Sequence, residues 1–471
     1  MPIPKGMRLA AKIVATLAGV VLALFLGWLG INLFDEDLTP AARILLTLPP
    51  NPYSPENNMY VAMAGFDAPS HQSMIEAGRH RIETYNRALD TLLVNPDAGV
   101  AFSKKSEPNK LEFQGDIKAW APLKSSIWSS AKAHHGEVTA SRTANEELYQ
   151  RYLALHELHG YFETARPSHL APVVYVPQSV RTLFLADVAT RVQTGTPQQQ
   201  RAALGDLQRD LLLWKTVLKG NGTLISKMLA AAGLHADMLL LADLVGDLET
   251  DPALLAGEVR PLVIPFDITD WRISDAFAAE MRTIDPVLRV IPLANSPVVG
   301  SSARPASGWG RSWNVLQVQF FKLHATENLE AEQMEHLRAL ADANPTQFSE
   351  ARDAYREWLE HRTQIASLRT LYNPVGKILV WIGSGVGYED YTRRIYDIAA
   401  FQRLVFLAYE IRRQAIGAKD VPKFINDHTE WATHPIDAKP FHWDPGTSTL
   451  AVITTGKQQS GRRFSITLPI R

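Results

Sequence analysis

The sequence contains no cysteine among its 471 residues. A chain without thiols cannot form a disulfide, a thiolate metal site, an iron–sulfur cluster or a c-type haem attachment. It also cannot carry the cysteine-linked lipid of a bacterial lipoprotein. Secreted eukaryotic domains of this size usually contain disulfides, so the absence favours a bacterial chain that folds across a membrane.

The chain also lacks an excess of either charge. Lys and Arg number 48, Asp and Glu number 49. Nucleic-acid binding depends on clustered positive charge, so nucleic acid is not an expected partner. Hydrophobic residues make up 46% and charged residues 21%. This ordinary balance argues against a polytopic membrane protein and against wholesale disorder.

Long uncharged runs are scarce, and one stands out near the N-terminus. Residues 13–34 carry no charge, and at about 1.5 Å per residue they cross a hydrocarbon core of about 30 Å. Basic residues precede this run and acidic residues follow it: Lys5, Arg8, Lys12, then Asp35, Glu36, Asp37. Positive charge stays in the cytoplasm. The sequence therefore predicts cytoplasmic residues 1–12, a transmembrane anchor at 13–34 and a periplasmic remainder, tethered to the bacterial inner membrane.

A cleaved signal peptide is the alternative interpretation of this segment. Its apolar region usually covers about 7–15 residues and ends at a small-x-small site. The present run is longer, and Asn32–Asp35 offers no such site, so a retained anchor is favoured. The other apolar stretch, 224–248, contains Lys227, Asp237 and further charged residues. It is therefore expected inside the domain, and only one span is predicted.

Helix signals dominate the chain after a proline-rich segment at 35–58, which is expected to be an extended linker. The domain at 59–446 is predicted to be mainly α-helical. Capping boxes stand at Thr143-x-x-Glu146 and Thr196-Pro197-x-Gln199, and Asp251-Pro252 and Asn344-Pro345 are further helix starts. The predicted helices cover residues 72–94, 144–163, 179–193, 197–219, 223–247, 252–257, 270–283, 311–342, 346–372 and 388–416.

The C-terminal residues 447–471 change to an alternating pattern. Leu450 and Val452 alternate in one arm, and Phe464, Ile466 and Leu468 alternate in the other. This spacing predicts a β-hairpin. An isolated hairpin is marginally stable, so it is expected to pack on the helices or to pair with another strand, such as Val173–Val176.

Two segments resemble known sequences. MYVAMAGFDAP at 59–69 resembles the start of the outer domain in a group of uncharacterised proteobacterial membrane-anchored proteins. HPIDAKPFHWDPG at 434–446 is similar to a P-x-x-x-K-P-[FL]-x-[YW]-D pattern at their C-termini. The resemblance implies a location in the bacterial envelope. It implies no activity and no site residues.

Three C-terminal histidines are the candidate metal ligands: His428, His434 and His442. They stand among carboxylates, and imidazoles with carboxylates are what zinc, copper or nickel would use in a protein without thiols. The spacing matches no established metal motif, and three prolines stiffen the segment. Histidines that cap turns and pack on tryptophans explain it equally well. We therefore expect the three rings to lie too far apart to share an ion, and no cofactor.

Three further motifs are incomplete. His156 and His159 stand three residues apart where the zincin motif requires four, and His159 is expected on a buried stripe. The glycines of 383–387 do not have dinucleotide-binding spacing, so a helix–helix connection is expected. Ser129 and Lys132 match the S-x-x-K of penicillin-binding proteins without the companion motifs. No catalytic residue is assigned.

The sequence leaves enzyme activity open and favours a non-enzymatic role. Helical stripes and caps are plentiful, whereas complete catalytic motifs are lacking. The preferred function is a tethered helical domain that binds another envelope protein or assists assembly. The alternative is a membrane-anchored envelope hydrolase, with metal bound by residues 428–444 or by His156 and His159.

The charge difference across residues 13–34 yields a test of topology. Alkaline phosphatase is active only after export. A fusion of this reporter after residue 60 should therefore be active, whereas a fusion of a cytoplasmic fluorescent reporter at the same position should stay dark. Fluorescence with an inactive phosphatase would show the opposite orientation.

Overall fold

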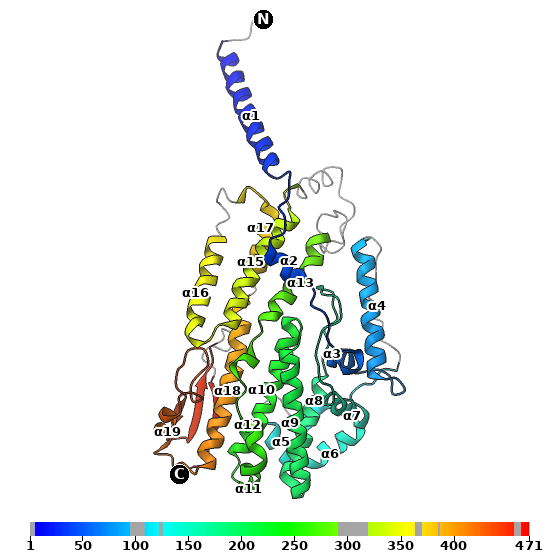
Figure 1. Cartoon of the computed structure of the whole chain (residues 1–471), viewed down its shortest axis with the longest axis vertical. Helices are drawn as coiled ribbons and strands as arrows, with labels where there is room; N and C mark the ends of the chain where they lie inside the picture. The colour runs from blue at the N-terminus through cyan, green and yellow to red at the C-terminus, as the bar shows by residue number, and fades with distance from the viewer. Residues whose placement is uncertain are drawn as a thin grey trace.

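The structure is a computed structural model that describes residues 5–94, 109–121, 126–290, 319–362, 370–384, 387–455 and 463–470. Helix accounts for 67% of it, and its strands form one small antiparallel sheet near the C-terminus. The predicted mainly helical class is thus confirmed. Figure 1 shows the first helix projecting from one end of a helical body, with the sheet toward the opposite end.

The elements follow one another along the chain. The N-terminal third forms α1 (Lys5–Ile31), α2 (Pro40–Leu46), η1 (Pro55–Asn57), α3 (Met59–Ala64), α4 (Met74–Val94), η3 (Ile117–Ala119), α5 (Ile127–Ala133), α6 (His135–Ala144) and α7 (Glu146–Leu155). The middle forms α8 (Gln178–Thr194), α9 (Pro197–Lys219), α10 (Leu224–Gly246), α11 (Pro252–Leu254), η4 (Leu255–Val259), α12 (Arg260–Val263), η5 (Ile268–Trp271) and α13 (Ser274–Val290). The last part forms α15 (Leu323–Asp342), α16 (Pro345–Arg362), α17 (Pro374–Ser384), α18 (Glu389–Arg413), α19 (Val421–Asp427), β1 (His442–Asp444), β2 (Thr449–Ile453) and β3 (Arg463–Thr467).

Helices with a start signal and a broad apolar stripe match their predictions. The helix α9 has the predicted bounds, and both bonds of its Thr196–Gln199 capping box are present. Asp251 and Asn344 also cap their helices as expected. The box at Thr143 is wrong, because Thr143 lies inside α6 and bonds Thr139 O instead. The predicted helix over 311–342 is interrupted: residue 319 is helical, 320–322 are not, and α15 begins at Leu323, while 311–318 lie outside the described residues.

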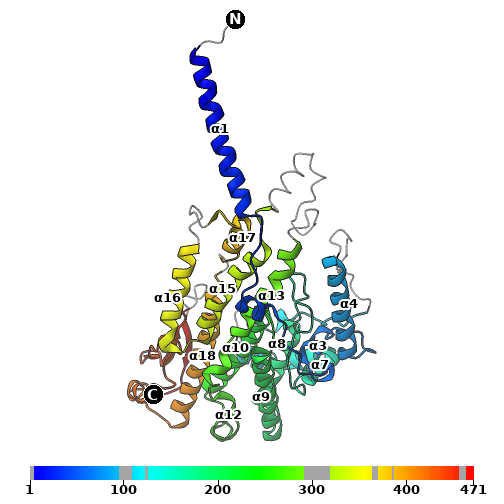
Figure 2. The same cartoon turned by 45° about the horizontal axis from the view of Figure 1, so that its top comes forward.

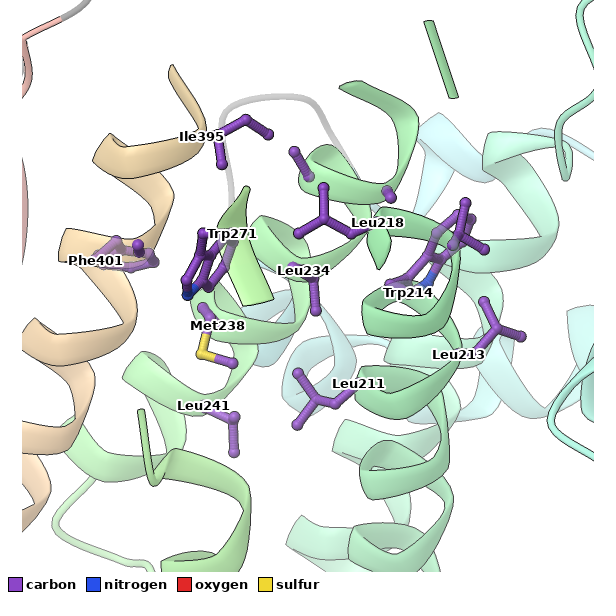
Figure 3. Packing of buried hydrophobic residues seen from close by; sticks show 14 of the residues in the cluster. Leu211, Leu213, Trp214, Leu218, Leu234, Met238, Leu241, Trp271, Ile395 and Phe401 are labelled. Carbon is purple, nitrogen blue, oxygen red and sulfur yellow. The ribbon is translucent and has the colours of Figure 1, made fainter. Parts of the chain in front are cut away.

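The core forms around α10. This helix contacts α5, α8, α9, α12, α13, α18 and the strand β3. Leu211 and Trp214 of α9 face Leu234 and Met238 of α10, with Trp271 and Phe401 on the other side (Figure 3). Gly233 lets the ring of Trp214 lie directly against the backbone of α10, where a Cβ would clash with it. Burial of this apolar surface stabilises the body by about 25 cal/mol per Å².

Two helices are long and apolar enough to cross a membrane. Residues Leu9–Ile31 have a mean hydropathy of 2.4, and none of them is buried in the protein. Leu224–Gly246 passes the same test of length and composition, but 61% of it is buried. As the sequence predicts, the second segment is therefore a core helix of the domain, and α1 is the candidate anchor.

The segment 35–58 is not the extended linker that its prolines suggest. It contains the short helix α2, whose Ala42 and Leu45 are buried. Asp35 accepts hydrogen bonds from the backbone N–H groups of His324 and Ala325 at the start of α15. The prolines initiate short helices at Pro40 and Pro55, because proline is favoured at the first helical position. The segment is thus an integral part of the domain.

The predicted hairpin is present, with a third strand that the sequence did not indicate. β2 pairs with β3 through Leu450 and Ile466, and β1 pairs with the other edge of β2. Of the two predicted alternatives, packing on the helices is confirmed, whereas pairing with Val173–Val176 is wrong, because those residues form no strand and β1 is the added strand. The sheet packs on α18 and α10. The hairpin is therefore part of the core.

Two side chains of β2 yield a test of this packing. Leu450 is fully buried, whereas Ile453 is 64% exposed. Leu450→Ala should lower the free energy of unfolding of the full chain by about 2–5 kcal/mol, because it leaves a cavity. Ile453→Ala in the same strand should change it by less than about 0.5 kcal/mol. Urea unfolding in detergent measures both, and equal effects would contradict the packing.

Candidate functional site

The three C-terminal histidines do not converge. His428 ends α19, where its Nδ1 lies 2.9 Å from Phe424 O and its ring packs between Phe424 and Trp431. His442 is exposed on β1. His434 and His442 border one cavity of about 640 Å³, but His428 does not. Throughout the described ranges, no three histidine or carboxylate side chains are grouped so that they could hold a metal ion.

His434 ties the C-terminal loop to α18. Its ring is buried, its Nε2 lies 3.1 Å from Asp397 Oδ1, and its Nδ1 accepts a hydrogen bond from Ile436 N. The same Asp397 oxygen accepts from the backbone N–H and the hydroxyl of Thr455, each at 2.8 Å. Since Nδ1 accepts, Nε2 is the donor to the carboxylate. Both ring nitrogens are therefore in use within the protein, and the residue has a structural role.

The side chains of His156 and His159 lie in different surroundings, one buried and one exposed. α7 ends at Leu155, so the chain leaves the helix before the second histidine. The His156 side chain is fully buried, and its Nε2 lies 3.1 Å from Asp210 Oδ1. His159 is exposed. The prediction that His159 is the buried member is thus wrong, because the apolar stripe does not continue past the helix end.

The remaining two motifs also have structural explanations. Ser129 and Ser126 share a hydrogen bond of 2.9 Å, and Lys132 Nζ bonds Glu249 Oε2 at 2.5 Å. The lysine therefore binds a carboxylate and not the serine.

The glycine-rich segment has no strand before it. Residues 378–382 lie within α17, so the strand that a dinucleotide-binding turn needs is not formed there. The predicted helix–helix connection lies between α17 and α18, but later than expected, because residues 383 and 384 still belong to α17; residues 385–386 lie outside the described ones.

The charged group that sequence reasoning missed lies between four helices. We call Tyr152, His156, Arg181, Asp210 and Asp237 the core ion cluster. Tyr152 donates to Asp210 Oδ1 at 2.5 Å, and Arg181 Nη2 lies 3.4 Å from Asp210 Oδ2. Arg181 also donates to Asp237 and, at 2.5 Å, to the carbonyl oxygen of Gly233. The side chains of both aspartates are fully buried, and that of Arg181 is 13% exposed.

The two aspartates of the core ion cluster have opposite protonation preferences. Burial alone would raise the pKa of Asp210, but its hydrogen bond with His156 and the charge of Arg181 outweigh burial and lower the pKa. Burial and the nearby Asp210 raise the pKa of Asp237 well above its usual value, despite Arg181. Like charges in one site cannot both ionise cheaply. The electrostatics therefore favour the ionised form at Asp210 and the protonated form at Asp237.

An apolar cavity of about 450 Å³ lies above this cluster. Arg181 and Trp214 form its floor, with the guanidinium carbon 5.1 Å from the centre of the indole ring. α8, α9 and α10 supply most of the wall, and Val174, Tyr175 and Val176 form one rim. Among the described residues, its lining contains no histidine and no carboxylate. We call this cavity the Arg181 pocket.

One signal in the sequence points to this site. α10 is apolar over most of its length but contains Lys227 and Asp237, which are both fully buried. A charge inside an apolar helix requires a partner. The partner of Asp237 is Arg181 on α8, which lies 56 residues away along the chain, so spacing alone could not find it.

Comparisons with known proteins assign no family to this chain. No family model matches it, and neither the curated proteins nor the solved structures include a match. The resemblance at 59–69 and 434–446 therefore stays a hypothesis, and function must be argued from geometry.

The opposite protonation of the two aspartates yields a matched test. Asp210→Asn removes a buried charge that Arg181, Tyr152 and His156 bind, so it should destabilise the full chain by about 3–5 kcal/mol. Asp237→Asn replaces a neutral carboxyl group with a neutral amide of equal shape, so it should cost about 1 kcal/mol or less. Urea unfolding at neutral pH compares the two variants.

The pH dependence of the same variant provides the control. The pKa of Asp237 is higher in the folded chain than in the unfolded chain, where it is about 3.9. Its contribution to the free energy of unfolding is therefore fully present below about pH 3.9. This contribution is lost as the pH rises through the folded-state pKa. Asp237→Asn has no proton to lose. The stability of the variant relative to the natural chain should therefore improve with rising pH. A relative stability that falls with pH would show that Asp237 is ionised.

Proposed function

We propose that the chain is a membrane-tethered binding protein of the bacterial envelope. In this proposal α1 crosses the inner membrane with its N-terminus in the cytoplasm, and the helical body stands in the periplasm. The exposed apolar surface of Leu9–Ile31 and the charge difference across it support this placement.

The Arg181 pocket is the proposed binding site for an apolar side chain of a partner protein. Its volume lies within the range of roughly 300–1,000 Å³ that is usual for ligand sites, and its wall is mainly apolar. The core ion cluster beneath it fixes the floor, because Arg181 of α8 is bonded to both α9 and α10. A rigid apolar cavity with few polar groups suits binding.

The rim of the pocket favours an extended polypeptide as the occupant. Residues 172–177 form neither helix nor strand, and prolines stand at both ends. Val173 and Tyr175 are 53% and 57% exposed, whereas Val176 between the helices is buried. Within the described residues, the N–H groups of 173–176 have no backbone partner. Such a segment can pair with an added strand, whose side chain then enters the pocket.

Hydrolysis receives less support from the same geometry. A hydrolase needs a general base or a metal-bound water within reach of its substrate. The imidazole and carboxylates of the core ion cluster are fully buried, and the described lining of the pocket contains no histidine or carboxylate. The single observation that supports the proposal is therefore the apolar pocket beside a rim whose N–H groups at 173–176 have no backbone partner within the described residues.

Cross-linking from the rim tests the proposal. The photoreactive residue p-benzoylphenylalanine at Tyr175, in the full chain in bacterial membranes, should form an adduct with one partner protein. Ala232→Trp, at an exposed alanine of the pocket mouth, should weaken binding about tenfold or more, corresponding to about 1.4 kcal/mol.

Ala202→Trp is the matched control, because Ala202 is an exposed alanine of α9 outside the pocket. It should leave the adduct unchanged. An adduct that survives Ala232→Trp, or that both substitutions reduce equally, would contradict binding in the Arg181 pocket.

A further inference from the structure

A cavity of about 640 Å³ lies between the first two turns of α16 and the C-terminal sheet. α16 contributes Ser349 and Arg352 to its lining, and α18 contributes Arg393. Residues 436–440 and 451–455 form the other side. Figures 1 and 2 both show the sheet beside the lower end of α16. We call this space the Arg393 cavity. Among the described residues it shares no lining residue with the Arg181 pocket.

Arg393 is a positioned cation of this cavity. Its side chain is half-buried, and its Nη1 donates to the carbonyl oxygen of Thr455 at 3.3 Å. The guanidinium carbon lies 5.7 Å from the centre of the Phe348 ring. The bond to Thr455 uses Nη1, and within the described residues the guanidinium donates no other hydrogen bond. The edge formed by Nε and Nη2 is therefore available for two parallel hydrogen bonds to an oxyanion.

No carboxylate of the described residues forms an ion pair with Arg393. Asp397 stands one turn further along α18, but it is fully buried and does not line the cavity. Its Oδ1 already accepts hydrogen bonds from His434 and Thr455. A guanidinium stays charged at neutral pH. The cavity therefore contains a positive charge that the described part of the chain leaves without an ionic partner.

The other charges of the described lining add to this positive potential. Arg352 and Lys439 are cationic, and Asp437 is the carboxylate among them. Asp437 pairs with Lys439 at 2.8 Å, and Arg352 pairs at 2.8 Å with Asp353, which lies outside the lining. The cavity also borders the N-terminal turn of α16, where the helix dipole favours negative charge. The lining as a whole favours an anion.

The remaining lining indicates what kind of anion fits. The Ser349 hydroxyl accepts a hydrogen bond from Arg352 Nη2 at 3.1 Å, which leaves its hydrogen free for a ligand oxygen. Much of the wall is apolar: Phe348, Ile436, Pro440, Ala451 and Val452. The volume exceeds what an inorganic anion needs and lies within the range of roughly 300–1,000 Å³ that is usual for organic ligands. The ligand should therefore combine an oxyanion with an apolar body.

We propose that the Arg393 cavity binds a small organic oxyanion, with a carboxylate or phosphate group on the free edge of Arg393. The apolar body of the ligand lies against Phe348 and Val452, and Ser349 donates a further hydrogen bond to the anionic group. This site is independent of the proposed partner binding at the Arg181 pocket. It gives the C-terminal loop and sheet a binding role that the three histidines do not provide.

Calorimetric titration of the full chain in non-ionic detergent tests this site. The probes are naphthyl phosphate, naphthoate and uncharged naphthol, and titration of detergent alone corrects for partition into micelles. At least one anion should bind with a Kd below about 1 mM, and naphthol should bind at least about tenfold more weakly. The tighter of the two anions identifies the headgroup. Absence of binding by both anions in this range, or equal binding of naphthol, would overturn the proposal.

Two pairs of variants locate the binding. Arg393→Gln should weaken the anion about tenfold or more, because it removes charge-assisted hydrogen bonds. Arg79→Gln changes the net charge equally at an exposed position of α4 outside the cavity, so it should leave binding unchanged. Equal affinities in these two variants would place the anion elsewhere and refute the site.

The second pair does not depend on the half-buried arginine. Ser349→Trp fills the cavity from an exposed position and should also weaken binding about tenfold or more. His361→Trp, at an exposed position of the same helix outside the cavity, is its control. Full anion affinity in Ser349→Trp would contradict binding in the Arg393 cavity, even if Arg393→Gln had lost affinity through misfolding.

Discussion

The arrangement of the helical body depends on the sharing of Arg181 between two carboxyl groups. Asp210 stands on α9 and Asp237 on α10, and the arginine of α8 bonds both of them and the backbone at Gly233. A buried charge or polar group without its partner costs free energy, so helices that slid past one another would leave Arg181, Asp210 or the carboxyl group of Asp237 unpaired. Apolar packing alone tolerates such shifts more easily. The charges therefore fix one register of the three helices.

The same interaction connects stability to binding. Arg181 is both the centre of the core ion cluster and the floor of the apolar pocket, so the floor is as rigid as the core. The N–H groups of residues 173–176 have no backbone partner within the described residues, although Val174 and Val176 pack on the core. A rigid cavity with a less constrained rim allows a partner strand to adjust while its apolar side chain meets a fixed surface. The burial of its imidazole and carboxylates supports the proposed role in recognition.

At the membrane end, local sequence and tertiary structure lead to different conclusions. The prolines of 35–58 predict an extended linker, yet Asp35 bonds the start of α15 and Leu45 is buried in the core. Residues 289 positions apart form this contact, and no local pattern could indicate it. The consequence for function is that the domain begins directly at the end of α1. In the proposed anchorage by α1, the domain would therefore stand close to the membrane surface.

The sequence by itself determined the helical class, the apolar N-terminal helix and the bounds of α9, because caps, stripes and uncharged runs are local properties that neighbouring residues satisfy. It also determined that α10 is a core helix, since Lys227 and Asp237 require partners inside protein. Only the tertiary structure decided which histidines are buried and which charges meet. His434 became a structural residue through Asp397, and His156 through Asp210. Those partners come from distant helices, and their proximity is a result of packing rather than of spacing along the chain.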